Sequence, residues 1–186
     1  MARNYRLGRR QEAVELTRIA ILAAARDVLA SGEPGLSVGA VARRAGVSRI
    51  TLYNRFGSKA GLLRELAAGA RPETSPSLAP GLDDPRDQLR QRIVDSCAGW
   101  ASDPALFRRL PAVGNVEMET PSADRALAER LGVADQLRAG CSLKEAEDVI
   151  GALTSFSVFD RLHKDGRRSP GAVADILMRL AAAILT

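Results

Sequence analysis

Apolar residues recur at intervals of three and four along most of the chain, and no segment alternates apolar and polar residues over five or six positions. The first spacing lines one face of an α-helix with apolar side chains, whereas strict alternation is typical of a β-strand. The sequence therefore predicts an all-α fold.

Four helices are predicted in the first 70 residues, because glycine, proline and serine interrupt the apolar pattern at regular points. Their expected bounds are 15–31, 37–45, 48–56 and 58–70. Ser37, Ser48 and Ser58 each stand where a hydroxyl can accept a hydrogen bond from the first turn of a helix, so we expect them to be N-caps. Residues 1–15 are expected to be a mobile basic arm that leads into the first helix.

A linker is predicted at residues 71–85, where four prolines stand among Ser, Thr, Gly and Asp and exclude a helix. Residues 16–70 then form one domain, a helix-turn-helix domain with a linking helix, and residues 86–186 form a second. Five further helices are expected at 86–102, 104–113, 122–139, 142–164 and 169–185. The last two are apolar on more than one side, which fits either a central core helix or a subunit interface.

Basic charge is concentrated at the N-terminal end of the chain. Residues 1–64 hold 12 Lys and Arg against 4 Asp and Glu, whereas residues 65–186 hold 15 against 18. Arginine accounts for 24 of the 27 basic residues, and its planar fork suits phosphate and guanine edges. The distribution favours a nucleic-acid partner, with a merely solvated basic face as the alternative. Arg3, Arg6, Arg9 and Arg10 could follow a minor groove or only add solubility.

Composition excludes several classes of protein. The chain is 46% apolar and 26% charged, and its apolar runs fall far short of the ~20 residues of a membrane span. Two cysteines and one histidine without metal-ligand spacing predict neither a disulfide framework nor a metal site, and no cofactor is expected. The basic N-terminus lacks the apolar segment of a secretory signal, so we expect a cytoplasmic protein.

The junction between the second and third helices has the pattern of a helix-turn-helix. Gly46 can adopt the positive φ of a tight turn, Val47 can fill the angle between the helices, and Ser48 can cap the next helix. With Leu52 and Phe56 turned inward, the opposite face of the third helix suits a major groove. That face consists of Arg49, Ile50, Thr51, Tyr53, Asn54 and Arg55. An ordinary helical hairpin with a solvated polar face is the alternative.

The same stretch resembles a known family. Two segments are similar to the N-terminal domain of tetracycline-repressor (TetR) family regulators of bacteria: LSVGAVARRAGVSRITLYNRFGSKAGLL at 36–63 and TRIAILAAARDVL at 17–29. The resemblance implies a homodimer whose N-terminal helices bind a double-stranded DNA operator, which is expected to be palindromic. It also implies that residues 86–186 bind a small-molecule effector and dimerise through their last two helices.

Individual roles follow from the resemblance at matching positions. Those expected to contact DNA phosphates are Ser37, Tyr53 and Lys59, and those expected to contact bases are Arg49, Thr51 and Asn54. Arg55 and Ile50 are further candidates for DNA contact. Gly39 departs from the family, which usually has a polar or charged residue there, and glycine weakens a helix by roughly 1 kcal/mol relative to alanine.

The C-terminal domain offers candidates without a motif. Trp100, Phe107 and Met118 could line an effector pocket or simply fill a core. The acidic residues Glu117, Glu119 and Asp124 could face a cationic effector or belong to a solvated loop. The residues expected at a dimer interface are Phe156, Phe159, Leu177 and Leu180.

These observations together predict a DNA-binding transcriptional regulator, a repressor released from its operator by a small molecule. Two alternatives remain at this stage: a ligand-independent architectural DNA-binding protein, and an all-α enzyme that carries a DNA-binding domain. The enzyme is disfavoured, because no nucleophile with its base, no carboxylate pair and no phosphate-binding glycine loop is recognisable. The expected partners are therefore operator DNA, an effector and a second copy of the chain, without a membrane.

Overall fold

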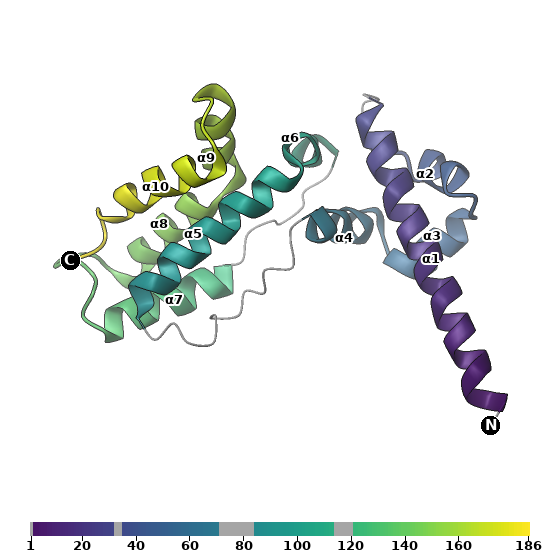
Figure 1. Ribbon diagram of the computed structural model, residues 1–186, viewed down its shortest axis with the longest axis horizontal. Coiled ribbons are helices and arrows are strands. Elements are labelled where there is room, and N and C mark those ends of the chain that lie inside the picture. The colour runs from purple at the N-terminus through teal and green to yellow at the C-terminus, as the bar shows by residue number, and fades with distance from the viewer. Residues whose placement is uncertain (1, 32–34, 71–83, 114–120) are drawn as a thin grey trace. The chain divides into compact units, whose positions relative to one another are not determined.

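The computed structural model describes residues 2–31, 35–70, 84–113 and 121–186 of the chain (Figure 1). These residues form helices joined by turns, and their single β contact is an isolated antiparallel bridge between Leu137 and Leu185. The predicted all-α fold is therefore confirmed. Within the described ranges, no helix is both long enough and apolar enough to cross a bilayer.

The chain divides into two compact units. The first comprises Met1–Gly69 with Ala105–Val116, and the second comprises Ala70–Pro104 with Glu117–Thr186. The sequence suggested a single boundary at 71–85, and thus missed that α6 (Pro104–Val113) belongs largely to the first unit. One contact that contributes to the attachment is a hydrogen bond from the Arg109 guanidinium to the carbonyl of Leu29 in the last turn of α1, where carbonyls have no partner within the helix.

The first unit contains α1 (Ala2–Ala30), α2 (Val38–Arg44), α3 (Arg49–Phe56) and α4 (Lys59–Ala70). The first helix was expected to begin at residue 15, whereas α1 already begins at Ala2, so this part of the prediction is wrong. That stretch holds no apolar stripe, but it is rich in Arg, Glu, Gln and Ala, which favour helix strongly enough to extend an existing one.

The core of the first unit consists of buried apolar side chains that its helices contribute. Its fully buried members include Ile21 and Ala25 of α1, Leu52 of α3, and Leu62 and Leu66 of α4. On the surface, Arg18 of α1 donates to Glu65 of α4 at 2.7 Å, and Arg26 donates to the carbonyl of Gly69 at 3.2 Å. Helix α4 is thus tied to α1 by two hydrogen bonds from arginine side chains.

The second unit contains α5 (Pro85–Ser102), α7 (Pro121–Val133), α8 (Leu143–Thr154), α9 (Phe156–Asp160) and α10 (Pro170–Ala181). Helix α5 contacts each of the other four, so it is the central helix of this unit. Asp84 caps its N-terminus by accepting from the backbone N–H of Arg86. A π-helical turn at Arg161–Asp165 extends α9.

Two helices of the second unit are shorter than expected. The predicted helix at 142–164 is interrupted at Ser155, whose extended backbone, with φ −74° and ψ 148°, ends α8 and caps α9. The predicted helix at 122–139 ends at Val133, because Asp135 adopts a φ of 55°. Serine is a good N-cap even where the apolar pattern continues past it, which is why the interruption was not predicted.

Candidate nucleic-acid interface

The turn between α2 and α3 has the geometry that its sequence predicts. Gly46 adopts a φ of 68°, and the N–H of Val47 donates to the carbonyl of Ala42 at 3.0 Å. The Ser48 hydroxyl then accepts from the N–H of Thr51 at 3.0 Å and caps α3. The two helices are therefore joined as a helix-turn-helix, with α3 as its second helix.

Helix α3 has one buried and one exposed face. Leu52 is fully buried and Phe56 is 7% exposed, whereas Ile50 is 72% and Tyr53 46% exposed. The remaining members of the outer face are Arg49, Thr51 and Asn54, which are exposed, and Arg55, which is half-buried. The predicted division between inner and outer faces is confirmed, and any contact with DNA stays a prediction.

Two further candidates flank this face on neighbouring helices. Ser37 caps α2, and its hydroxyl accepts from the N–H of Ala40 at 3.3 Å while remaining exposed. Lys59 is the first residue of α4, directly after Ser58, whose hydroxyl accepts from Gly61 at 3.0 Å. Three serine caps thus position the starts of α2, α3 and α4.

The charge of this region has one sign. Residues 36–64 contain six Lys and Arg and no Asp or Glu. Arg44 is neutralised by Asp27 of α1 at 2.9 Å. The other five basic side chains have no ion-pair partner within the described residues: Arg43, Arg49, Arg55, Lys59 and Arg64. The surface around α3 therefore presents uncompensated positive charge, which a polyanion would neutralise.

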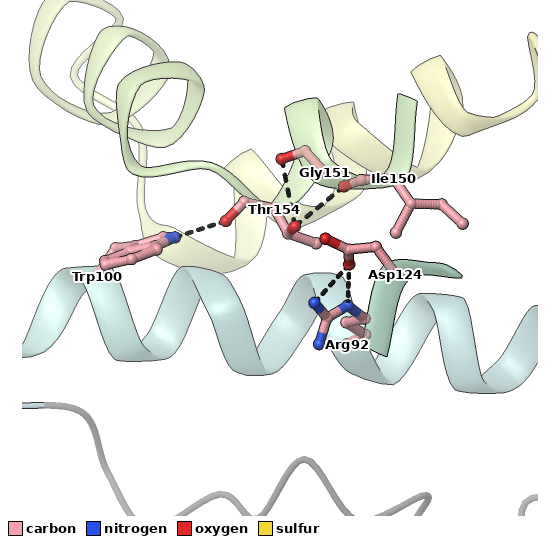
Figure 2. Close-up of polar contacts among 6 residues, drawn as sticks. All are labelled: Arg92, Trp100, Asp124, Ile150, Gly151 and Thr154. Atoms are coloured by element: carbon pink, nitrogen blue, oxygen red, sulfur yellow. Dashed lines mark hydrogen bonds and ion pairs between the residues drawn. The ribbon is translucent and has the colours of Figure 1, made fainter. Parts of the chain in front are cut away.

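The predicted effector positions fall in different parts of the chain. Trp100 is buried in α5 of the second unit, and Phe107 is buried in α6, which belongs with the first unit. Met118 lies outside the described residues. The Trp100 indole donates to the carbonyl of Thr154 at 2.9 Å (Figure 2). It also meets the ring of Phe156 edge-on, with 5.5 Å between the ring centroids. Trp100 is thus part of the core of its unit.

One candidate of the acidic group is placed differently from expectation. Glu117 and Glu119 lie outside the described residues, but Asp124 is only 3% exposed on α7 and is not part of a solvated loop. Arg92 of α5 donates to it through Nε at 2.8 Å and also through Nη2 (Figure 2). The two residues are 32 positions apart in the sequence, which explains why the pair was missed.

The residues predicted at the dimer interface separate into two groups. Phe159 and Leu177 are buried within the unit itself, which corrects the expectation that they face a partner. Phe156 is half-buried, and Leu180 of α10 is 52% exposed. The apolar stripes on these helices are too wide for the sequence to separate inner from outer positions. Of the four residues predicted at the interface, only Leu180 has a largely exposed side chain.

Comparisons with known proteins fit this geometry. Residues 21–66 match the model of bacterial regulatory proteins of the tetR family. NalD, the secondary repressor of the MexAB-OprM multidrug efflux pump in Pseudomonas aeruginosa, is a similar solved structure. It is 23% identical, with 93% of this chain and 98% of that chain covered and a TM-score of 0.68.

Two other solved structures are similar at the level of the fold. A TetR family transcription regulator from Marinobacter aquaeolei VT8 is 21% identical, with 94% of this chain and 98% of that chain covered and a TM-score of 0.61. A TetR transcriptional regulator from Rhodococcus sp. RHA1 is 23% identical, with 91% of this chain and 95% of that chain covered and a TM-score of 0.50. No curated protein matches the chain.

Proposed function

We propose that this DNA-binding regulator, whose residues 21–66 belong to the tetR family of bacterial regulatory proteins, is a cytoplasmic repressor that leaves its operator when a small molecule binds its second unit. The observation that supports DNA binding most directly is the acid-free segment 36–64, which surrounds an exposed second helix of a helix-turn-helix. Such a helix enters the major groove of DNA in proteins of this architecture.

Two classes of contact are proposed on this surface. Ser37, Tyr53 and Lys59 hold DNA phosphates. Ser37 and Lys59 stand at helix starts, where a hydroxyl or an ammonium is a suitable donor to an anion, and Tyr53 offers an exposed phenol hydroxyl on α3. Arg49, Thr51 and Asn54 read base edges, because they occupy the exposed first two turns of α3. Arginine suits guanine and asparagine suits adenine in the major groove.

Selection of binding sequences from random DNA, followed by affinity measurements on a panel of single-base variants, tests both classes. Lys59→Ala should weaken binding to every sequence. It should also reduce the slope of log affinity against log salt concentration by about one, because one phosphate contact is lost. Arg49→Ala should cost roughly 1–3 kcal/mol at one base pair. Lys144→Ala is a matched control, because Lys144 lies in the second unit and pairs with Asp148 at 2.8 Å. Uniform weak binding to all DNA, without a selected sequence, would instead favour an architectural protein.

The role of a repressor is supported by the likeness of the fold to NalD, a repressor of a multidrug efflux pump, and release by an effector is proposed from the family resemblance. If an effector weakens operator binding by some factor, DNA must weaken effector binding by the same factor. Trp100 is the only tryptophan of the chain, so its emission reports on the second unit. Titrating compounds against this emission, with and without operator, measures both affinities. A compound that binds tightly and leaves operator affinity unchanged is not the effector.

A homodimer follows from the same proposal, because a two-fold pair of helix-turn-helix units matches a palindromic operator. The proposed interface uses α8 and α10, with Leu180 as an exposed apolar contact. Light scattering at micromolar concentration should then give about twice 19.8 kDa. A monomer that binds a palindrome with full affinity would contradict the dimer.

A further inference from the structure

Gly39 of α2 lies directly beneath the side chain of Arg49. A Cβ placed on Gly39 would be 2.6 Å from Nη2, 3.1 Å from Nε and 3.2 Å from Cζ of the Arg49 guanidinium. Gly39 is buried although it belongs to a short helix on the surface of the first unit. The guanidinium therefore occupies the space that any side chain at position 39 would need.

The backbone at this position does not itself require glycine. Unlike Gly46 and Gly57, Gly39 has no positive φ, so an L-amino acid fits the local helical conformation. Alanine would in fact favour helix more than glycine does. The obstacle to a side chain at position 39 is thus the far end of Arg49, which is flexible, and not a neighbouring backbone group.

The guanidinium of Arg49 rests against the backbone of α2 at Gly39 and has no polar anchor among the described residues. Its side chain forms no hydrogen bond or ion pair with any residue that the structure describes. A side chain anchored by a carboxylate would resist displacement, whereas one that rests on a bare backbone moves when a methyl group is added. Its position on the exposed surface of the helix-turn-helix is therefore sensitive to residue 39.

We propose that Gly39 is a positioning residue for Arg49 in operator recognition: the missing Cβ lets the guanidinium lie across α2, and this fixes where its charge meets the DNA. The proposal rests on the proposed function, since it assigns a role to Arg49 at the same interface. It adds a determinant of specificity that touches no base itself and acts only through Arg49.

The test combines Gly39→Ala, Arg49→Ala and the double variant with the panel of single-base operator variants. Gly39→Ala should keep or raise the thermal midpoint and yet lower operator affinity, with the change confined to the base pairs that Arg49→Ala affects. Because one residue acts through the other, the double variant should bind like Arg49→Ala alone. Gly69→Ala is the control, because a Cβ at Gly69 of α4 meets nothing within 4 Å.

A second measurement examines the contact without DNA. The Nε–Hε resonance of Arg49, identified by its loss in Arg49→Ala, should shift in Gly39→Ala and stay in place in Gly69→Ala. Equal losses from Gly39→Ala with and without Arg49, or wild-type binding by Gly39→Ala, would overturn the positioning role while leaving the proposed function intact. Failure of the wild-type chain to select any DNA sequence would instead overturn the proposed function and the positioning role together.

Discussion

The indole N–H of Trp100 donates a hydrogen bond to the backbone carbonyl of Thr154, across 2.9 Å in the interior of the second unit. Thr154 is the last residue of α8, so its carbonyl lacks the partner that a continuing helix would supply. Figure 2 shows the indole reaching from α5 to this carbonyl. The bond therefore stabilises the interruption between α8 and α9, because a side chain of α5 supplies the hydrogen-bond donor that the last carbonyl of α8 lacks.

Removing this donor should destabilise the second unit. Trp100→Phe leaves a buried carbonyl unpaired, which costs about 1–3 kcal/mol beyond the lost apolar contacts. Thr154→Val is the matched control: it removes the hydroxyl that bonds the carbonyl of Ile150 at 2.9 Å but keeps the carbonyl bond to Trp100. Denaturant unfolding followed by circular dichroism gives both values. A loss for Trp100→Phe no larger than that for Thr154→Val would contradict this role of the indole.

The buried pair of Arg92 and Asp124 should depend strongly on both partners. Arg92→Met removes the guanidinium from a buried carboxylate, and breaking a buried ion pair in this way typically costs about 3–5 kcal/mol. Adding Asp124→Ala should recover part of that loss, because the buried charge is then gone. The exposed pair of Arg125 and Glu129, at 3.0 Å, provides the control, and Arg125→Met should cost no more than about 1 kcal/mol. The free energy of unfolding from urea titration decides between these outcomes.

The sequence predicted the first unit well because its signals are local. Gly46, Ser48 and the spacing of Leu52 and Phe56 lie within eleven residues, and each restricts the backbone or a helix face directly. The inner and outer faces of α3 could therefore be assigned before any tertiary contact was known. The helical start of α1 was missed, since intrinsic helix propensity acts there without the apolar stripe on which the prediction relied.

The second unit was predicted less well because its decisive contacts join residues far apart in sequence. Arg92 meets Asp124, and Trp100 meets Thr154 across 54 positions, so neither pair leaves a periodic pattern. Leu177 and Leu180 lie on one amphipathic helix and look alike in sequence, yet only Leu177 is buried. The width of an apolar stripe shows that a helix is covered, but it does not show which neighbour covers each side chain.

Ile50 should read a thymine methyl group in the operator. It is a large apolar side chain that is 72% exposed on the first turn of α3, and apolar contact with the C5-methyl is the usual way in which such a residue recognises thymine. Replacing thymine by deoxyuridine at the contacted position removes one methyl, so the affinity should fall about fourfold, as for one buried CH₂. In Ile50→Ala this difference between thymine and deoxyuridine should disappear.

A control for this substitution is available outside the interface. Val133 is 91% exposed at the end of α7 in the second unit, so Val133→Ala should retain the full preference for thymine. Scanning deoxyuridine through the selected operator locates the position. The same preference in Ile50→Ala and in the wild-type chain would exclude Ile50 as the reader.

Cys97 should make the stability of the second unit fall in alkaline solution. Burial raises the pKa of its thiol from 9.0 to about 11, since the thiolate would lose its hydration inside α5. The thiol therefore stays protonated in the folded chain at a pH where it ionises in the unfolded chain. The contribution of the protonated Cys97 thiol to the free energy of unfolding is complete below about pH 9. It is lost as the pH rises toward about 11, and the loss amounts to up to about 2 kcal/mol.

Urea unfolding at several values of pH across this interval measures the loss. Cys97→Ala removes the titrating group, so its free energy of unfolding should fall less steeply with pH than that of the wild-type chain, even though the smaller side chain lowers stability at every pH. Cys141→Ala is the comparison, because Cys141 is only partly buried and its thiol is more accessible to water in the folded chain. Its slope should stay close to that of the wild-type chain. Identical slopes for Cys97→Ala and the wild-type chain would show that the alkaline loss comes from other groups, such as Tyr or Lys side chains, and not from the buried thiol.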